Sequence, residues 1–419
     1  MKLIADLQIH SRFSRATSSS INLANLEKYA RLKGINLLGT GDFTHPKWLA
    51  ELKNELKEDG SGILTSSSGF HFVLQGEISN IYTQDGKGRR IHNLLLARNF
   101  EIVEQINAAL LKKGRLDYDG RPMFGFSCIE LVEMMKEIDD GIEIIPAHAW
   151  TPWYGLFGSM SGFDSVEECF KEYAHKIHAI ETGLSSDPAM NWRLSKLDKY
   201  TLLSSSDAHS FWPWRLGREA NVFDIEWSYD DLLQAIRNKK GFAETIEMWP
   251  HEGKYHYTGH RNCDVCLSPK ESLKIKNICP KCRRPLTVGV AQRVEQLADR
   301  EEGFVPKNAV PFRNLIPLSE VIAGTTGHAV SSKQVWEEYY RLINEFGNEF
   351  KILLEAEENK LKKTTKEKIA ENIIKNREQK ILFKPGYDGV YGIPIFDGEK
   401  IKEEKILPKI KQAGLDEFM

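Results

Sequence analysis

The segment Ser204–His209 places a carboxylate and an imidazole at the end of an apolar run. Asp207 and His209 stand two residues apart, directly after Tyr200–Leu203. In an extended segment such residues share one face, so both side chains can reach one metal site. Other apolar runs end at or just before residues of the same type, namely His10, Asp42, Glu77, His148 and Glu181. His92 is the exception, because it lies at the start of its run.

These side chains predict metal-dependent phosphoester hydrolysis. Imidazole and carboxylate ligands without thiolates suit Zn, Mn, Mg or Fe. A glutamate that bridges two ions would place them close enough to clamp the attacking and leaving oxygens of a phosphoryl group. We therefore expect two or three divalent ions in this site, with Asp207, Glu77 and His148 as catalytic groups. For any single residue a solvated loop position is the simpler interpretation, but the shared placement of the set favours a site.

Seven β-like runs alternate with helical stretches and must position these side chains. The runs cover residues 3–5, 35–38, 71–77, 91–96, 142–146, 177–181 and 200–203. This alternation indicates an α/β barrel or a wound sheet, with largely parallel strands. The placement of the candidate ligands at strand ends favours the barrel, whose active sites collect at the carboxyl ends of its strands.

Composition limits the classes of protein that remain. The 419 residues suffice for two or three domains, and no apolar run approaches the roughly 20 residues of a membrane span. The first six residues turn acidic before an apolar core develops, so we expect no signal peptide and a cytoplasmic location. Because 57 basic residues face 59 acidic ones, any nucleic-acid surface should be a local patch.

Four of the six cysteines form a metal-ligand pattern. Cys263, Cys266, Cys279 and Cys282 follow the spacing C-x2-C-x12-C-x2-C, which predicts a structural zinc held by four thiolates. Cys128 and Cys169 fit buried thiols. Basic residues surround the pattern, among them Arg283 and Arg284, so the ribbon is either a clamp for DNA phosphates or a surface with scattered solvated charges.

Two aromatic clusters follow candidate metal ligands. One runs from Trp150 to Phe157 after His148, and the other from Phe211 to Arg215 after His209. They either pack the mouth of a barrel or form a pocket in which a base stacks. The residues predicted to contact substrate are Trp153, Tyr154, Phe157, Trp212, Asn191 and Arg89. Asn191 or the backbone amides around Gly155 and Gly158 would donate to a base carbonyl, and Arg89 would steer a phosphate.

The motifs together resemble the PHP (polymerase and histidinol phosphatase) family of metal-dependent phosphoesterases. The resemblance covers roughly residues 1–245 and rests on Asp6–Ser11, Gly41-Asp42, Gly76-Glu77, His92-Asn-Leu, Pro146–His148 and Ser206–His209. It implies a distorted (β/α)7 barrel around up to three metals. Gln8 stands where the family usually has a histidine, and Phe43 stands where a histidine is common. His45 is a weaker candidate ligand.

Beyond the barrel, the pattern predicts a zinc ribbon over residues 250–288, a mostly helical domain over 289–400, and a tail over 401–419. Helical spacing is clear from Val335 to Leu353; we expect an exposed charged helix over 355–380 and a loop over 383–394. In the tail, Gln412, Leu415 and Phe418 resemble the box that docks on a DNA sliding clamp, with Met419 in place of a second aromatic residue.

The combination of barrel, ribbon and helical region resembles the archaeal endonuclease Q family over nearly the whole chain. That resemblance implies nicking of double-stranded DNA on the 5′ side of uracil, hypoxanthine, xanthine or an abasic site. Two alternatives remain open. One is a PHP phosphatase for a small phosphomonoester, which leaves the region after the barrel without a task; the other is a non-catalytic DNA-binding scaffold.

Overall fold

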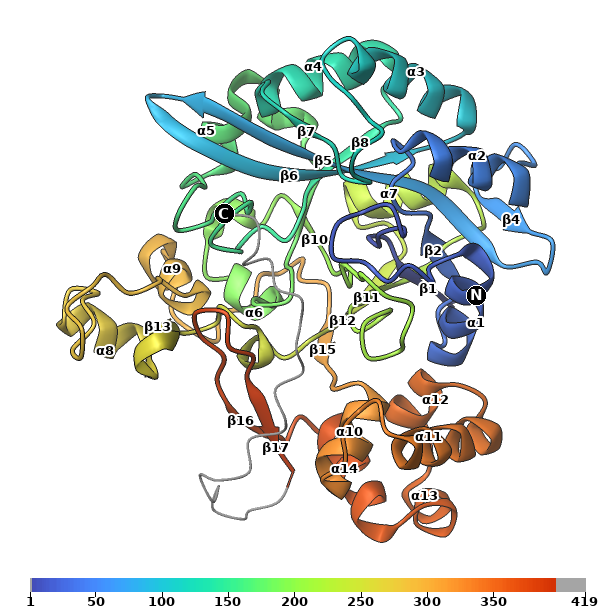
Figure 1. Cartoon of the computed structure of the whole chain (residues 1–419), viewed down its shortest axis with the longest axis vertical. Coiled ribbons are helices and arrows are strands. Elements are labelled where there is room, and N and C mark those ends of the chain that lie inside the picture. Colours follow the sequence, from blue (N-terminus) through green and yellow to red (C-terminus); the bar gives the residue numbers. More distant parts are fainter. Residues whose placement is uncertain (1, 397–419) are drawn as a thin grey trace.

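The computed structural model describes residues 2–396, which form a sheet-containing body, a small projecting module and a helical unit (Figure 1). The body holds the first half of the chain, the module carries the cysteines of the ribbon pattern, and the helical unit follows. No helix among the described residues is both long enough and apolar enough to cross a membrane. Gln412, Leu415 and Phe418 lie outside the described residues.

All seven predicted β-runs form strands, which confirms that part of the sequence analysis. They are β1 (Lys2–Asp6), β2 (Leu37–Gly39), β5 (His71–Gln84), β6 (Lys87–Ala97), β8 (Glu143–Pro146), β9 (Ala179–Glu181) and β10 (Thr201–Leu203). Hydrogen bonding links β1, β2, β5, β6 and β8 in that order, and β9 pairs with β10. β8 lies beside β9, and an isolated bridge between Ile9 and Ala208 joins the segments that follow β1 and β10. The seven strands therefore follow one another around a ring.

The strands are mixed in direction, whereas a largely parallel sheet was expected. β1, β2 and β5 are mutually parallel, but β6 runs antiparallel to both β5 and β8. The reason is the turn Asp85-Gly86, whose residues have φ of 52° and 72°. Two such left-handed residues make a tight hairpin turn, which can join only antiparallel strands.

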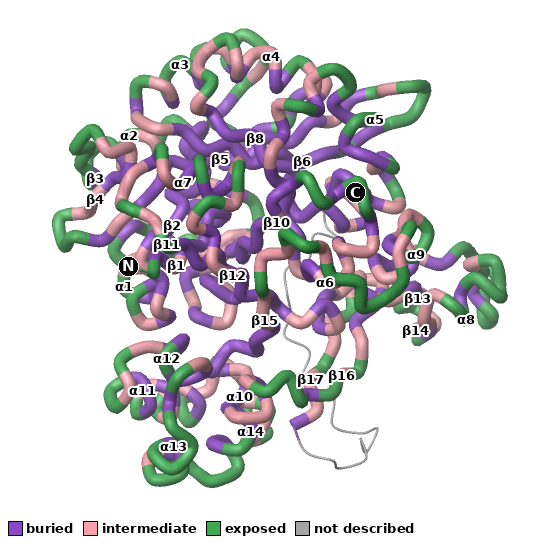
Figure 2. The backbone as a smooth tube through the Cα atoms, turned by 180° about the vertical axis from the view of Figure 1, so that it is seen from behind, coloured by how far each residue is buried: buried purple, intermediate pink, exposed green. Residues whose placement is uncertain are grey.

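The ring encloses a buried apolar cluster. Successive side chains of a strand point to opposite faces, so each strand contributes to this cluster on one face and to the outer core on the other. The ring strands and β11 supply Ala5, Leu37, Val73, Leu94, Ile145, Ala179, Leu203 and Phe223 to the cluster. Helix α7 (Tyr229–Asn238) packs against it through Leu232 and Ile236. Figure 2 shows these central strands as the most buried part of the body.

Helices and shorter strands surround the ring. The remaining strands are β3 (Leu56–Lys57), β4 (Leu64–Ser66), β7 (Met123–Phe124), β11 (Ala220–Asp224), β12 (Phe242–Glu247), β13 (Thr258–His260), β14 (Val265–Leu267), β15 (Phe312–Asn314), β16 (Leu382–Lys384) and β17 (Ile393–Ile395). The first helices are α1 (Leu23–Lys33), α2 (Pro46–Glu55), α3 (Phe100–Leu111), α4 (Cys128–Ile138), α5 (Val166–Phe170) and α6 (Pro188–Asn191). Asn22 caps α1 through its side chain, and Gly34, with φ of 102°, ends it; both residue types are typical of these positions.

The region after the ribbon pattern is less simple than one helical domain. α8 (Pro269–Lys274) and α9 (Val290–Leu297) belong to the projecting module, and β15 adds a strand to β12 in the main sheet. The helical unit is α10 (Leu318–Thr326), α11 (Lys333–Phe346), α12 (Glu349–Leu354), α13 (Glu358–Thr364) and α14 (Glu367–Arg377). The expected exposed helix over 355–380 is two helices, and Ile369 and Ile373 of α14 are buried. The expected loop over 383–394 carries the hairpin β16–β17.

A buried ion pair joins the helical unit to the body. Lys33, at the end of α1, places its Nζ 2.7 Å from Oε1 of Glu349, and both side chains are almost fully buried. The same ammonium donates to the carbonyl of Pro213 at 2.8 Å. Glu349 also accepts from the backbone of Leu318 and the hydroxyl of Tyr339, each at 2.9 Å. This network connects α1, the loop after His209 and three helices of the unit.

We predict that Lys33→Met destabilises the fold by about 3–5 kcal/mol, because it leaves the Glu349 carboxylate buried without its cation. Lys333→Met is the matched control, since Lys333 pairs with Glu337 on the exposed side of α11. Urea unfolding of both variants measures the difference. Equal midpoints for the two would contradict the importance of the pair.

Candidate metal centre and cysteine module

Two groups of candidate ligands meet at one carboxylate. His10, Asp207 and His209 form one group, and Glu77, His92 and His148 form the other. Glu77 Oε2 lies 3.0 Å from His10 Nε2, whereas Glu77 Oε1 lies 2.7 Å from His92 Nδ1 and 3.5 Å from His148 Nε2. Glu77 is therefore placed to bridge two cations, as the sequence predicted for a glutamate of this site.

Most of these residues lie at or just after the carboxyl end of a strand, as the sequence predicts. The direction of β6 explains the exception, His92. His10, Asp42, His148 and Asp207 follow β1, β2, β8 and β10 within a few residues, and Glu181 is the last residue of β9. β6 runs opposite to its neighbours, so its beginning lies at the end of the ring where parallel strands finish. That direction places His92 with the other ligands. Glu77 lies within β5 rather than at its end, because β5 continues to Gln84.

Three of these residues have unusual backbone conformations. Asp42, His148 and Asp207 have φ of 42°, 32° and 48°, in the left-handed region that side chains with a Cβ rarely occupy. Such conformations cost energy and persist where the surroundings enforce them, commonly at functional sites. Gly183 packs directly against the backbone of His148, because a Cβ at Gly183 would lie 2.7 Å from the Cα of His148.

Asp42 orients His10 instead of joining either group. Its Oδ1 lies 2.9 Å from His10 Nδ1, while Oδ2 accepts from the backbone and hydroxyl of Ser11 and the hydroxyl of Ser14. A carboxylate behind an imidazole fixes its tautomer and leaves the other ring nitrogen for a metal. The free nitrogen here is Nε2, which faces Asp207 and Glu77.

The other predicted ligands stand apart from the two groups. Glu181 accepts from the backbone of His148 through Oε2, and burial raises the pKa of Glu181 to about 8. His45 precedes α2 and stacks on Phe13 at 4.3 Å. Gln8 is fully buried, and neither atom of its amide has a hydrogen-bond partner within residues 2–396.

The electrostatics of the site suit divalent cations. Burial opposes the charged form of His10, but the charges of Asp42 and Asp207 outweigh it and raise the pKa of His10 well above its usual value. Burial and the nearby guanidinium of Arg121 lower the pKa of His92 to about 3, which keeps that imidazole neutral and able to ligate. The site thus attracts positive charge while the imidazole of His92 stays unprotonated.

An unsatisfied oxygen supports the metal interpretation. Glu77 Oε1 is buried and accepts no hydrogen bond from the described residues, although two imidazole nitrogens lie nearby. Buried carboxylate oxygens normally have a partner. A cation between Glu77, His92 and His148 would supply it, and a second between Glu77, His10, Asp207 and His209 would complete the pair.

Arg121 also reaches the site, and the sequence analysis missed it. Its Nη1 lies 3.4 Å from Glu77 Oε2. Arg121 comes from the segment between α3 and β7, which carries no strand-end pattern and no ligand spacing, so the sequence offered no signal for it. Its neighbour Gly120 approaches the site closely, because a Cβ there would lie 2.2 Å from Asp42 Oδ2.

The predicted substrate residues fall into three places. Tyr154 packs against His92 at 4.5 Å and Trp153 is half-buried beside Tyr255, so both lie near the second ligand group. Phe157 and Asn191 are buried, and Asn191 accepts from Trp150. Trp212 stacks on Trp214 and packs at a tilted angle against Trp336, at the contact with the helical unit.

The arginines predicted to bind phosphate differ in exposure. Arg89 is buried, donates to the carbonyl of Gly162 and covers the ring of Phe163 at 3.9 Å, so it holds the neighbouring loop. Arg283 and Arg284 are exposed on the projecting module. Of the proposed amide donors, that of Gly158 is already bonded to the carbonyl of Gly155.

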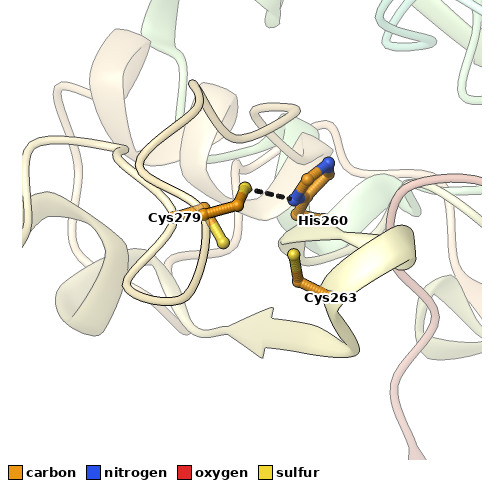
Figure 3. Close-up of side chains that lie close together, drawn as sticks. His260, Cys263 and Cys279 are labelled. Atoms are coloured by element: carbon orange, nitrogen blue, oxygen red, sulfur yellow. Dashed lines mark hydrogen bonds between the residues drawn. The ribbon is translucent and has the colours of Figure 1, made fainter.

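The module gathers a ligand set that differs from the predicted one in a single member. His260, Cys263, Cys279 and Cys282 have ligand atoms within 4.8 Å of one another. Figure 3 shows His260, Cys263 and Cys279 close together. Cys266 lies outside this group, with its Sγ 3.9 Å from the carbonyl of Pro385. Two turns of the same form supply the set, H-x2-C and C-x2-C. Each ends with a left-handed residue, Asp264 with φ of 49° and Arg283 with φ of 64°. The sequence analysis missed the His260–Cys263 turn because the two C-x2-C pairs already formed a complete zinc-ligand pattern.

Comparison with solved structures identifies the relatives of this fold. The crystal structure of the lesion-specific endonuclease PfuEndoQ from Pyrococcus furiosus is 31% identical and superposes with a TM-score of 0.85, over 96% of this chain and 98% of that one. A structure of endonuclease Q with a 27-mer duplex substrate, which has an abasic lesion at the active site, is also 31% identical, with a TM-score of 0.86 over 97% of this chain and 100% of that one.

The chain belongs to the endonuclease Q family.

Sequence relatives extend beyond the solved endonuclease Q structures. Protein MJ0043 of Methanocaldococcus jannaschii is 33% identical over 308 residues, which are 70% of this chain but only 36% of that longer protein. Protein YqxK of Bacillus subtilis is 28% identical over 413 residues, 93% of this chain and 98% of that one. The family description "MJ0043 C-terminal domain" matches residues 317–380, which are the helical unit.

For this member of the endonuclease Q family we predict that His260→Ala and Cys279→Ser each lose one zinc ion per chain, while Cys266→Ser retains it. The reason is that three thiolates and one imidazole converge, and Cys266 faces elsewhere. Elemental analysis of the purified variants measures the zinc content. Loss of zinc from Cys266→Ser together with retention in His260→Ala would restore the four-thiolate assignment.

Proposed function

We propose that this chain is a metal-dependent DNA repair endonuclease, which hydrolyses the phosphodiester on the 5′ side of deaminated bases and abasic sites. The observation that carries the proposal is the bridging position of Glu77 between two ligand groups, in a chain of the endonuclease Q family. We also infer that the ring of seven strands is the distorted (β/α)7 barrel of the PHP family, whose ligands gather at one end of the ring.

The chain's own residues prepare the site for this chemistry. Glu77, His92 and His148 would hold one divalent ion, and His10, Asp207 and His209 with the other oxygen of Glu77 would hold a second. When bound, such a pair lowers the pKa of water and neutralises charge on the phosphate. Asp42 fixes the tautomer of His10, and the backbone amide of His148 is held by Glu181. These contacts keep the ligands in place before substrate arrives.

A hollow beside the second ligand group suits an extrahelical base. It has a volume of about 400 Å³ and is lined by Trp153, Arg90 and Met160, among others. Trp153 offers a face for stacking, and Arg90 offers donors for the carbonyl that deamination creates. Adenine and cytosine present an amino group there, which would leave those donors unpaired. We propose this hollow as the site that reads the lesion.

The exposed arginines of the cysteine module are proposed to contact duplex phosphates. Arg283 and Arg284 lie beside the left-handed turn that ends the second ligand pair, so a metal bound there would fix the backbone that presents them. The C-terminal box with Gln412, Leu415 and Phe418 stays a candidate docking point for a DNA sliding clamp, on the sequence alone. The proposed partner of the folded region is therefore lesion-containing duplex DNA.

The function is tested with labelled duplexes that each carry one uracil, hypoxanthine, xanthine or abasic site, and with an undamaged duplex. We expect a single nick 5′ of each lesion in the presence of Mn or Mg. Asp207→Asn should lower the nicking rate at least about 100-fold while duplex binding is retained, because even the outer partners of metal ligands contribute factors of 10–100.

Asp140→Asn is the matched control, since Asp140 is exposed and pairs with Lys176 on the surface. Equal cutting of damaged and undamaged duplexes would contradict the lesion-reading hollow. Full nicking by Asp207→Asn would contradict the metal centre. Hydrolysis of small phosphomonoesters without nicking would favour the phosphatase alternative, and binding without any hydrolysis would favour the scaffold.

For the cysteine module, we predict that replacing both Arg283 and Arg284 with alanine weakens binding to damaged and undamaged duplexes alike. The slope of log affinity against log salt should become shallower by about 0.9 for each phosphate that the arginines no longer neutralise. Replacement of Lys112 and Lys113 at the end of α3 serves as the charge-matched control. An unchanged salt slope in the arginine variant would count against this role of the two arginines.

A further inference from the structure

Arg121 stands between the two ligand groups without being a ligand of either. Its guanidinium is paired at 3.4 Å with Glu77 Oε2, the oxygen that faces His10, and its side chain is 21% exposed. Its charge acts on His92 in one group and on Asp207 and His209 in the other. A cation thus reaches the point where a phosphate must approach both proposed ions.

The segment that carries Arg121 is fixed on several sides. The amide of Gly120 donates to the carbonyl of Phe13, and its carbonyl accepts from the hydroxyl of Thr44, both at 3.0 Å. The carbonyl of Pro122 accepts from the amide of Ser79, two residues after Glu77 on β5, at 3.0 Å. The lack of a side chain at Gly120 lets this backbone lie directly against Asp42. The position of Arg121 is therefore set by the same elements that carry the ligands.

The turn itself orients the arginine. The amide of Arg121 donates to Oδ1 of Asp119 at 3.1 Å, which fixes the direction of the backbone at that residue. The other oxygen of Asp119 lies 3.2 Å from Nε of Arg15. Asp119 is buried although Arg15 is largely exposed, so the turn is tied down beneath the surface. Such local carboxylate-to-backbone bonds are typical of rigid turns.

Two other arginines of this region, Arg89 and Arg218, already bind protein carbonyls. Arg89 donates to Gly162, and Arg218 donates to Ser206 through both Nε and Nη2. Arg121 differs, because its partner is the carboxylate of a proposed metal ligand and part of its side chain is open to solvent. A guanidinium has five N–H donors in a planar fork, and a single bond to Glu77 leaves others for a substrate.

We propose that Arg121 binds a non-bridging oxygen of the scissile phosphate, as a substrate-contacting residue of the nuclease. A planar guanidinium matches the tetrahedral oxygens of a phosphate and forms strong charge-assisted hydrogen bonds with them. During hydrolysis a water oxygen bonds to phosphorus, one ester P–O bond breaks, and the leaving oxygen takes a proton. The non-bridging oxygens carry the added negative charge in between, so a fixed cation beside them stabilises that state.

This inference rests on the proposed nuclease function, but its test measures binding rather than cutting. Duplexes with one abasic site are prepared with either a normal phosphodiester or an uncharged methylphosphonate at the scissile position. Affinities are measured by fluorescence anisotropy in the Asp207→Asn background, which prevents cutting. If that background nicks as fast as the unchanged protein, the proposed metal centre fails, whereas the Arg121 contact is judged by the affinities alone.

With Arg121 present, we expect the methylphosphonate to lower affinity about tenfold, as for a charge-assisted hydrogen bond. In Arg121→Gln the same replacement should lower affinity less than about twofold, because the partner of the charge is gone. A methylphosphonate placed three phosphates away should have the same effect in both proteins. An equal loss at the scissile position in both proteins would overturn the proposal.

Arg15→Gln is the matched control. This substitution removes the guanidinium that pairs with Asp119 of the same turn, but it leaves Arg121 in place. The full tenfold effect of the methylphosphonate should therefore persist. Loss of the effect in Arg15→Gln as well would assign it to the turn and overturn a direct contact. Thermal unfolding checks each variant. If Arg121→Gln does not fold, Arg121→Lys replaces it, and the methylphosphonate should then lower affinity less than about fivefold. A full tenfold loss of affinity in Arg121→Lys would refute the contact between the guanidinium and the phosphate.

Discussion

The carboxylate of Glu77 is the constraint on which the rest of the site depends. It lies within a long buried strand, and its two oxygens face separate groups of imidazoles. A buried carboxylate without compensating charge is expensive, so the surrounding cations are required for stability as well as for chemistry. Burial raises the pKa of Glu77, yet the charge of Arg121 and the hydrogen bond from His10 outweigh it and hold that pKa well below its usual range. The carboxylate is therefore charged and ready to bind cations.

Much of the fold followed from the sequence because strand, turn and cap signals are local. The seven β-runs and the cap at Asn22 depend on neighbouring residues. The ligand positions followed from one further rule, that parallel strands finish at one end of a ring. His92 was an exception to this rule because the direction of a strand within the sheet cannot be predicted from one apolar run. Once β6 is known to reverse, His92 obeys the same geometry as the rest.

The contacts that the sequence analysis did not predict share a physical cause, which is that contacts between separate segments leave no spacing pattern in the chain. His260 lies with Cys263, Cys279 and Cys282 because the left-handed residue after Cys263 closes a turn that begins at His260, which the cysteine spacing does not indicate. Arg121 reaches Glu77 across 44 positions of sequence, through a segment with no pattern of its own. Trp212 was a candidate for a base pocket because its aromatic cluster follows His209, and in the structure its ring packs against Trp336.

That last contact changes the role of the helical unit. Trp212 and Trp214 each pack at a tilted angle against Trp336 of α11. The carbonyl of Pro213 between them accepts from Lys33, which is paired with Glu349 of α12. Pro213 follows His209 by only four residues. Apolar residues would fill this interface with similar stability, but an ion pair with directional hydrogen bonds fixes a position more narrowly than apolar packing does. The helical unit therefore holds the loop after the Asp207–His209 pair, and so helps to position the candidate ligands.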